Sequence, residues 1–422
     1  MSAAGPAPAI DAARVLADLA DLETLTGGPG GARRVCWTPV WGAARDLLRD
    51  RIAEVGIADV EVDEAGNLWA RLPGADRRAP ALALGSHLDS VPGGGPLDGA
   101  LGVMAALGAL RAWAAAPKPP PRDLVLIDFA DEEGSRFGRS LFGSSALAGT
   151  LDPAELAGLA DADGNPIGEV LAGAGVDPAR APDASRRLAT IAAYLELHIE
   201  QGPVLDGAGE SCAAVSGCVG VERLRLAFAG QAAHAGTTPM DRRRDAGLAA
   251  ADLAVVAERI AREHGGVATT GRIEMEPGII TAVAGRATVS VDLRHPDPEA
   301  LAAMLAAVRE AADVIADARS CPVAAEPVWR IAPIPFDPAL VARAERAAAA
   351  AGGRPVAIAS GALHDAAEMA RVVPAAMIFA ASVAGISHAK EERSRDEDLG
   401  AALAAFGELV AAALLEGLVE AG

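Results

Sequence analysis

The stretch Asp123-Leu-Val-Leu-Ile-Asp-Phe-Ala130 is a short apolar run that is followed directly by acidic residues. Runs of this length and composition are typical of strands buried on both faces of a sheet. Similar runs occur at Ala81–Ser86, Ala192–Ile199 and Ala375–Ala380, with helical segments between them. This alternation predicts an α/β fold, with a mostly parallel sheet and helices on both faces.

The middle of the chain has a different pattern. Val221–Ala229 alternates polar and apolar residues, as a half-exposed strand does. The segments that follow predict the order β-α-β-β-α-β, which suits a small α+β unit with helices on one face of an antiparallel sheet. We therefore expect residues 212–329 to form a smaller domain, inserted into a larger α/β domain of residues 1–211 and 330–422.

Composition limits the classes of function. The chain has 422 residues and a formal net charge of −20, which disfavours nucleic-acid binding but leaves room for a local arginine that binds an anionic substrate. Its four cysteines form no CxxC pair, which fits a reducing compartment. We see no signal peptide, and the apolar run Leu409–Leu418 is short and contains Glu416, so we expect an amphipathic helix, no membrane span and a cytoplasmic protein.

Metal-binding residue types follow the predicted strands. His87 comes directly after the run at Ala81–Ser86, and Asp98 lies in the glycine-rich loop beyond it. Ligands bind open α/β sheets at the carboxyl ends of the strands, and imidazole and carboxylate are ligands that zinc prefers. Asp89 can accept the second N–H of His87 and so fix its tautomer.

Two further strands end in the same way. Glu132 and Glu133 follow the opening run, and adjacent carboxylates repel each other unless a cation or a shared proton relieves them. Glu133 suits a metal ligand, which leaves Glu132 as a base for a metal-activated water. His198 shares one strand face with acidic residues, and His388 lies beyond the strand at Ala375–Ala380.

Each motif alone is also typical of a solvated turn, an acidic surface loop or an edge strand. Four of them at strand ends of one predicted sheet favour a shared metal site. Beyond them, His234 lies in a turn-rich loop, Arg294 ends a predicted strand and His364 precedes a helix. An arginine at a strand end can bind a carboxylate with two hydrogen bonds or form a surface ion pair, and its sequence context leaves both open.

In order along the chain, the motifs are GSHLDSV with LDG, DEEGSRFG, HIEQGP, AHAGTTPM, SGALHDA and GISH. Together they resemble the N-carbamoyl-L-amino acid hydrolase, allantoate amidohydrolase and beta-ureidopropionase branch of the di-metal M20 family, over nearly the whole chain. The resemblance implies a homodimer, with the inserted domain as lid and dimerisation domain. It also implies two divalent ions per subunit, of zinc, manganese, cobalt or nickel.

The resemblance also implies roles for individual residues. Asp98 would bridge the two ions, His87 and His198 would complete one, and Glu133 and His388 the other. Glu132 would be the general base, and His234 would stabilise the oxyanion, reaching in from the partner subunit. The implied substrate contacts are Gln201, His234, Thr281, Arg294 and His364.

Two departures from the family pattern bear on the substrate. Thr281 stands where an asparagine is usual, and Leu363 where a glycine is common. The expected reaction is hydrolysis of the linear amide C–N bond of a small ureido acid, first an N-carbamoyl-L-amino acid, with allantoate or 3-ureidopropionate as alternatives. A dipeptidase or N-acyl amino acid deacylase is a more distant alternative, and His198 argues against it because the peptidase branch commonly has an acidic residue there. A non-catalytic binding protein would lack a ligand or the base, and all are present.

Overall fold

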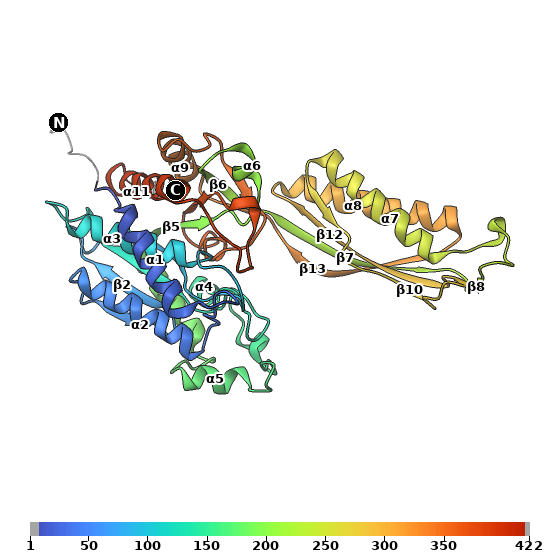
Figure 1. Cartoon of the computed structure of the whole chain (residues 1–422), viewed down its shortest axis with the longest axis horizontal. Coiled ribbons are helices and arrows are strands. Elements are labelled where there is room, and N and C mark those ends of the chain that lie inside the picture. The colour runs from blue at the N-terminus through green and yellow to red at the C-terminus, as the bar shows by residue number, and fades with distance from the viewer. Residues whose placement is uncertain (1–7, 418–422) are drawn as a thin grey trace. The chain divides into compact units, whose positions relative to one another are not determined.

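The computed structural model describes residues 8–417 and divides the chain into two compact units (Figure 1). One unit consists of Met1–Ser216 and Phe336–Gly422, and the other is the segment Gly217–Pro335 between them. Each unit has its own buried hydrophobic core.

The first unit is built on a nine-stranded sheet in the order β1-β2-β4-β3-β5-β16-β6-β14, with β15 paired to β6. Its strands are β1 (Val60–Val62), β2 (Leu68–Leu72), β3 (Ala81–His87), β4 (Leu124–Phe129), β5 (Ile191–Ile199), β6 (Cys212–Cys218), β15 (Ile358–Ser360) and β16 (Ala375–Ala380). The sheet also includes β14 (Ile334–Pro335), whose residues, like the end of β6, fall inside the segment Gly217–Pro335. The central strands β4, β3, β5 and β16 pair in parallel. Their carboxyl ends therefore meet at one edge of the sheet.

The prediction of a mostly parallel sheet is corrected by the outer strands. β1 and β2 form an antiparallel ribbon that adds to β4, while β6 adds antiparallel to β16 and carries β14. The central strands are apolar runs buried over nearly their whole length, which is the pattern of parallel strands covered on both faces. The outer strands are short or lie next to the inserted segment, and their sequences carry no comparable signal. The sheet is thus mixed, with helices on both faces.

Helices cover the two faces of this sheet as separate layers. The larger core packs the sheet against α1 (Ala12–Thr26), α2 (Pro39–Glu54), α3 (Ala100–Ala114), α9 (Pro338–Ala350) and α11 (Asp396–Leu415). The other helices are α4 (Phe142–Ala148), α5 (Ile167–Gly173), α6 (Val204–Ala208) and α10 (Asp365–Met369), with 3-10 turns η1 (Pro153–Leu156), η2 (Ala181–Thr190) and η4 (Val383–Gly385). Residues of α4, α5 and η2 form a second core with Trp37 and Trp41.

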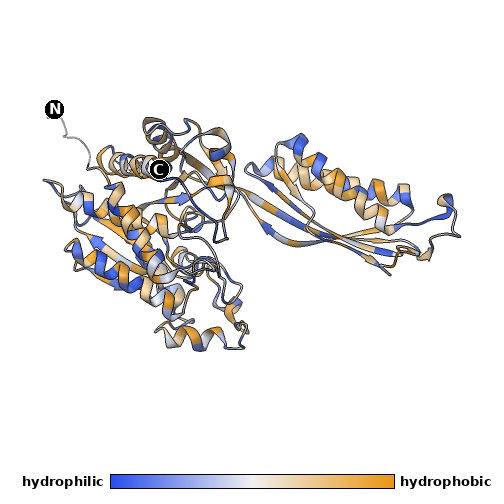
Figure 2. Cartoon of the chain, in the orientation of Figure 1, coloured by the Kyte–Doolittle hydropathy of each residue, from blue (hydrophilic) through white to orange (hydrophobic). Residues whose placement is uncertain are grey.

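The second unit consists of a sheet in the order β10-β12-β7-β13, with β9 paired to β12, and two long helices. Its elements are β7 (Gly220–Ala229), β8 (Ala233–His234), η3 (Met240–Arg242), α7 (Ala246–His264), β9 (Val267–Thr269), β10 (Ile273–Glu276), β11 (Ala282–Val283), β12 (Arg286–His295), α8 (Pro298–Arg319) and β13 (Val323–Ile331). All pairings are antiparallel. In Figure 2, α7 and α8 carry both hydrophobic and hydrophilic bands, as helices with one buried face do.

One helix among residues 8–417 is long and apolar enough to cross a membrane by length and composition, namely α11. However, 67% of its apolar window is buried inside the protein, and its side chains belong to the larger core. It is therefore a core helix of the first unit. Leu418, the last residue of the predicted amphipathic run, lies outside the described residues. The four cysteines are buried, and none forms a disulfide within residues 8–417.

Candidate metal centre

The predicted metal-binding residues lie at the carboxyl edge of the parallel strands. His87 is the last residue of β3, and His198 is the penultimate residue of β5. Glu133 follows β4, and His388 lies on the loop between β16 and α11. Asp98 lies just before α3, whose first turn follows Gly99 with its φ of 64°. The sheet therefore collects side chains from four separate stretches of the chain.

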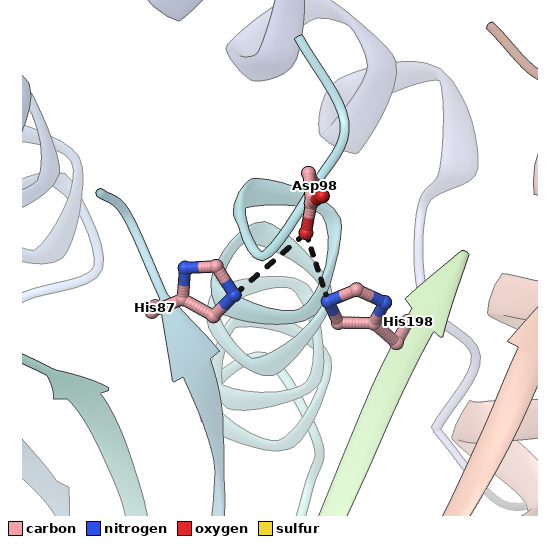
Figure 3. Close-up of side chains that lie close together, drawn as sticks. All are labelled: His87, Asp98 and His198. Atoms are coloured by element: carbon pink, nitrogen blue, oxygen red, sulfur yellow. Dashed lines mark ion pairs between the residues drawn. The ribbon is translucent and has the colours of Figure 1, made fainter. Parts of the chain in front are cut away.

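The first cluster consists of His87, Asp98 and His198, all three buried (Figure 3). Oδ1 of Asp98 lies 3.3 Å from Nε2 of His198 and 3.8 Å from Nε2 of His87. Figure 3 shows both rings pointing toward that carboxylate from neighbouring strands.

The second cluster consists of Asp98, Glu133 and His388. Here Nε2 of His388 lies 3.3 Å from Oδ2 of Asp98 and 3.6 Å from Oε2 of Glu133. The side chain of His388 is 53% exposed, so this cluster is more open to solvent than the first. Asp98 belongs to both clusters and turns a different oxygen to each.

These distances fit a pair of metal ions. Zinc bonds of about 2.0–2.2 Å in a tetrahedron place neighbouring ligand atoms roughly 3.3–3.6 Å apart, close to the separations in both clusters. Imidazole and carboxylate ligands suit zinc, manganese, cobalt and nickel. Burial, and then the charge of Asp98, raises the pKa of Glu133 to about 7, while a hydrogen bond to Asp98 raises the pKa of His388 to about 9. A divalent cation would relieve this crowding of carboxylates in place of protons.

Backbone carbonyls orient the histidines of the first cluster. Nδ1 of His198 lies 3.0 Å from the carbonyl oxygen of Ile199, and Nδ1 of His87 lies 3.1 Å from the carbonyl oxygen of Asp89. With Nδ1–H donated in this way, each Nε2 keeps its lone pair toward Asp98, as a metal ligand requires.

The predicted partner of His87 is therefore corrected in one detail. The backbone oxygen of Asp89 is nearest to Nδ1 of His87, and its carboxylate lies farther away at 3.6 Å. That carboxylate instead accepts the backbone N–H groups of Glu132 and Glu133, at 3.3 and 3.2 Å. Through these two hydrogen bonds, Asp89 connects the loop after β3 with the loop after β4, which carries Glu132 and Glu133.

Glu132 lies beside the first cluster without being a member of either cluster. Its Oε2 atom is 3.7 Å from Nε2 of His87, and burial raises its pKa well above the usual value. The neighbouring charge of Glu133 acts in the same direction, and His87 opposes it. A carboxylate in this position can accept a proton from a molecule bound between the clusters.

Two predicted substrate contacts also lie at this edge. Nε2 of Gln201 donates to Oδ2 of Asp98 at 2.8 Å and to Oγ of Ser387 at 3.2 Å. His364 is buried, with Nε2 3.0 Å from Oγ of Ser360 and its ring centroid 4.4 Å from that of His198. Burial holds the pKa of His364 well below its usual value, so the ring is neutral.

Another possible ligand group brings Glu196 and His364 to His198. Glu196 already accepts hydrogen bonds from Oγ of Ser86 at 2.7 Å and from the backbone N–H of Ala366 at 2.9 Å. Glu196 and His364 therefore already have hydrogen-bond partners within the protein. We interpret them as residues that support His198, and not as ligands of a further metal ion.

The remaining predicted site residues, His234, Thr281 and Arg294, belong to the second unit. His234 on β8 pairs with Ala282 on β11, and the backbone N–H of Ala235 donates to the carbonyl of Thr281 at 2.9 Å. His234 and Thr281 are therefore neighbours on a small exposed ribbon. Arg294, near the end of β12, donates from Nε to Oδ1 of Asp292 at 2.8 Å.

Several supporting residues escaped the sequence analysis. Asp128 is fully buried in β4, forms an ion pair with Arg45 at 2.7 Å and accepts the backbone N–H of Leu88 at 2.8 Å. Arg34, also fully buried, donates from Nε to the carbonyl of Leu88 at 2.8 Å. These contacts fix the backbone directly after His87. The one available signal was the aspartate inside an otherwise apolar run, since a buried charge needs a partner.

Comparison with known proteins shows the family of the chain. The sequence model of the peptidase family M20/M25/M40 matches residues 83–412. The chain belongs to this family. The resemblance predicted from the motifs is thereby confirmed, and with it the hydrolase class. The matched residues include both clusters, Glu132 and the whole inserted segment of this M20 chain.

Similar M20 proteins cover nearly its full length. An N-carbamoyl-L-amino acid amidohydrolase of Geobacillus stearothermophilus is 38% identical over 370 residues, which is 87% of this chain and 90% of that protein. An allantoate amidohydrolase of Escherichia coli K12 is 33% identical over 372 residues, 88% of this chain and 90% of the relative. The crystal structure of a hydantoinase/carbamoylase family amidase from Burkholderia multivorans matches with a TM-score of 0.87 at 34% identity, covering 96% of this chain and 99% of the other.

Proposed function

We propose that this M20 hydrolase uses two divalent metal ions to hydrolyse the linear amide C–N bond of an N-carbamoyl (ureido) acid. The observation that carries the proposal is the position of Asp98, whose two carboxylate oxygens face His198 and His388 at 3.3 Å each. A bridging carboxylate of this kind is what a pair of neighbouring ions needs.

The ligands divide between the ions according to the two clusters. His87 and His198 would hold one ion, Glu133 and His388 the other, and Asp98 both. When bound, the ions supply Lewis acidity toward the substrate carbonyl and lower the pKa of a water molecule. Zinc, manganese, cobalt and nickel all fit this donor set, and availability in the cell selects among them.

Glu132 performs the proton transfers. Its carboxylate takes a proton from the attacking water, whose oxygen forms a bond to the ureido carbon. Glu132 then gives that proton to the leaving nitrogen as the C–N bond breaks. Breaking this one C–N bond leaves a carbamic acid, which then loses carbon dioxide as its remaining C–N bond breaks. Overall, one water and the ureido acid give an amino acid, ammonia and carbon dioxide. The backbone bonds from Glu132 and Glu133 to Asp89 hold the base and its neighbouring ligand in a fixed relation.

The inserted unit supplies substrate contacts and dimerisation in this proposal. His234 stabilises the oxyanion from the partner subunit, and Arg294 binds the substrate carboxylate, for which its guanidinium is suited. Gln201, Thr281 and His364 complete the pocket. The unit acts as a lid that excludes water when it closes. The support for these roles is the M20 membership together with the HIEQGP, AHAGTTPM and SGALHDA motifs, which contain Gln201, His234 and His364.

The first choice of substrate is an N-carbamoyl-L-amino acid, because the Geobacillus relative carries that name at 38% identity. Allantoate is the nearest alternative, because the Escherichia relative is named for it. Thr281 and Leu363 stand at positions where the family usually has asparagine and glycine, and they shape the pocket that selects the substrate. The buried cysteines, which form no disulfide in the described part of the chain, support action in the cytoplasm.

Ammonia release from a panel of ureido acids tests this proposal. The enzyme is stripped of metal and reloaded with manganese, zinc or cobalt, and then offered N-carbamoyl-L- and D-amino acids, allantoate, 3-ureidopropionate, an N-acetyl amino acid and a dipeptide. We expect metal-dependent ammonia release from one ureido acid. Hydrolysis of the acyl or peptide controls alone would contradict the ureido assignment and leave the metal site standing.

A further inference from the structure

The buried carboxylate of Glu392 connects the two loops that carry Asp98 and His388. Its Oε1 atom accepts the backbone N–H groups of Leu97 and Asp98, both at 3.1 Å. Its Oε2 atom accepts the hydroxyl of Ser387, directly before His388, at 2.8 Å. Glu392 is only 3% exposed, so water does not compete for these bonds.

The surroundings are built to receive this side chain. A Cβ atom at Gly95 would overlap both Oε1 and the Cβ of Glu392, so the loop before Asp98 approaches the carboxylate at a position where only glycine fits. The fully buried guanidinium of Arg34 lies close enough to interact with the charges of both Glu392 and Asp98. Glu392 is therefore a buried anion with specific partners, although it belongs to neither cluster.

The two clusters differ in how firmly their histidines are held. His87 and His198 lie on β3 and β5, where pairing with neighbouring strands fixes the backbone. His388 lies on a loop, is half exposed, and has a φ of 54°. A non-glycine residue with positive φ is strained and persists only where its surroundings hold it. The bond from Ser387 to Glu392 is a contact next to His388 that can do so.

We propose that Glu392 is a positioning residue that sets the metal affinity of the second cluster, made of Asp98, Glu133 and His388. It holds the backbone of Asp98 and the residue before His388 at a fixed separation, so that their side chains converge. The first cluster depends on it less, because His87 and His198 lie on paired strands, whereas His388 lies on the loop that Glu392 contacts through Ser387. This inference rests on the proposed pair of metal ions.

Metal titration of three variants tests it. Glu392→Ala removes all of these bonds. Ser387→Ala removes the bond that links Glu392 to the His388 loop, together with the contacts of the Ser387 hydroxyl to Asp98 at 3.3 Å and to Gln201 at 3.2 Å. Glu391→Ala is the matched control, since Glu391 is the exposed neighbour of Glu392 and its side chain forms an ion pair with Lys390 at 4.0 Å. Each metal-free protein is titrated with Co²⁺, following bound metal by equilibrium dialysis and the visible absorption of the ion, alongside the melting temperature without metal.

We expect the wild type and Glu391→Ala to bind two ions per subunit. Glu392→Ala and Ser387→Ala should keep the affinity of one ion within about threefold and weaken the other by about 10–100-fold, the usual effect of losing a partner behind the ligands. Glu392→Gln keeps an oxygen for Leu97 and Asp98, and should rescue part of this loss. If Glu392→Ala does not fold, Ser387→Ala and Glu392→Gln still decide the matter.

The proposal would be overturned if Glu392→Ala bound both metal ions with wild-type affinities. If Glu392→Ala does not fold, wild-type affinities in both Ser387→Ala and Glu392→Gln would overturn it. So would an equal loss at both steps. A wild type that binds fewer than two ions would instead contradict the proposed function, which makes the two failures distinguishable.

Discussion

Nε2 of His388 lies 3.3 Å from Oδ2 of Asp98, the carboxylate oxygen that faces away from the first cluster. The two residues come from the loop after β16 and the loop before α3, and the parallel strands bring these loops together. Because of this contact, Asp98 belongs to both three-residue clusters, and its carboxylate is common to the two proposed metal sites.

Replacement of the shared carboxylate should affect both ions. In Asp98→Ala we expect metal content to fall from two ions per subunit to less than one, and ammonia release to fall by more than about 100-fold, because a ligand matters more than the outer partners that cost 10–100-fold. Elemental analysis after dialysis measures this. Asp46→Asn, an exposed change on α2, is the control. A variant that keeps two tightly bound ions would contradict the bridging role.

Replacement of the proposed base should separate chemistry from metal binding. Glu132→Gln keeps the size of the side chain and removes its ability to accept a proton. We expect two bound ions, a similar KM and a kcat lower by about 10²–10⁴-fold, the usual contribution of a general base. Steady-state kinetics and metal analysis of the same sample provide the test. Turnover at the wild-type rate would exclude this role for Glu132.

The buried pair of Arg45 and Asp128 should contribute to stability. Asp128→Asn leaves the guanidinium of Arg45 without its charged partner, and breaking a buried pair in this way costs about 3–5 kcal/mol. We expect a clearly lower denaturation midpoint for the first unit, measured by urea unfolding. The matched change Asp46→Asn disrupts the exposed pair with Arg49 and should cost less than about 1 kcal/mol. Equal losses of unfolding free energy in the two variants would show that the buried ion pair contributes no more to stability than the exposed one.

Arg294 should act on substrate binding without affecting metal. Arg294→Lys retains the charge and loses the planar fork that binds a carboxylate with two hydrogen bonds. We expect KM to rise by about tenfold or more, corresponding to the 1.5–3 kcal/mol of a hydrogen bond to a charged group, with two ions still bound. Arg225→Lys, an exposed pair with Glu326 on the same sheet, is the control. An unchanged KM for Arg294→Lys would remove this residue from the substrate pocket.

Much of the first unit could be predicted because its central strands are apolar runs that end in polar residues. His87, Glu133 and His198 follow or end such runs, and the rule that parallel strands share a carboxyl edge brings them together. The antiparallel strands β1 and β2 were not predicted because they are short and carry little pattern of their own. β6 has seven residues, but it begins at Cys212, where the sequence predicted the start of the inserted domain.

The supporting contacts were harder to predict. Glu392 and the carboxylate of Asp89 bind backbone N–H groups, which every residue but proline offers, so no sequence pattern marks the partner. The geometry of folded loops determines these pairings. The same holds for Arg34, whose partner is the carbonyl oxygen of Leu88.

The most direct test of the account is a crystal structure of the manganese-loaded enzyme, with anomalous diffraction data collected on both sides of the manganese absorption edge. We predict two anomalous peaks per subunit, one among His87, Asp98 and His198 and the other among Asp98, Glu133 and His388. A single peak, or peaks that leave Asp98 without a metal on each oxygen, would contradict the two-metal account.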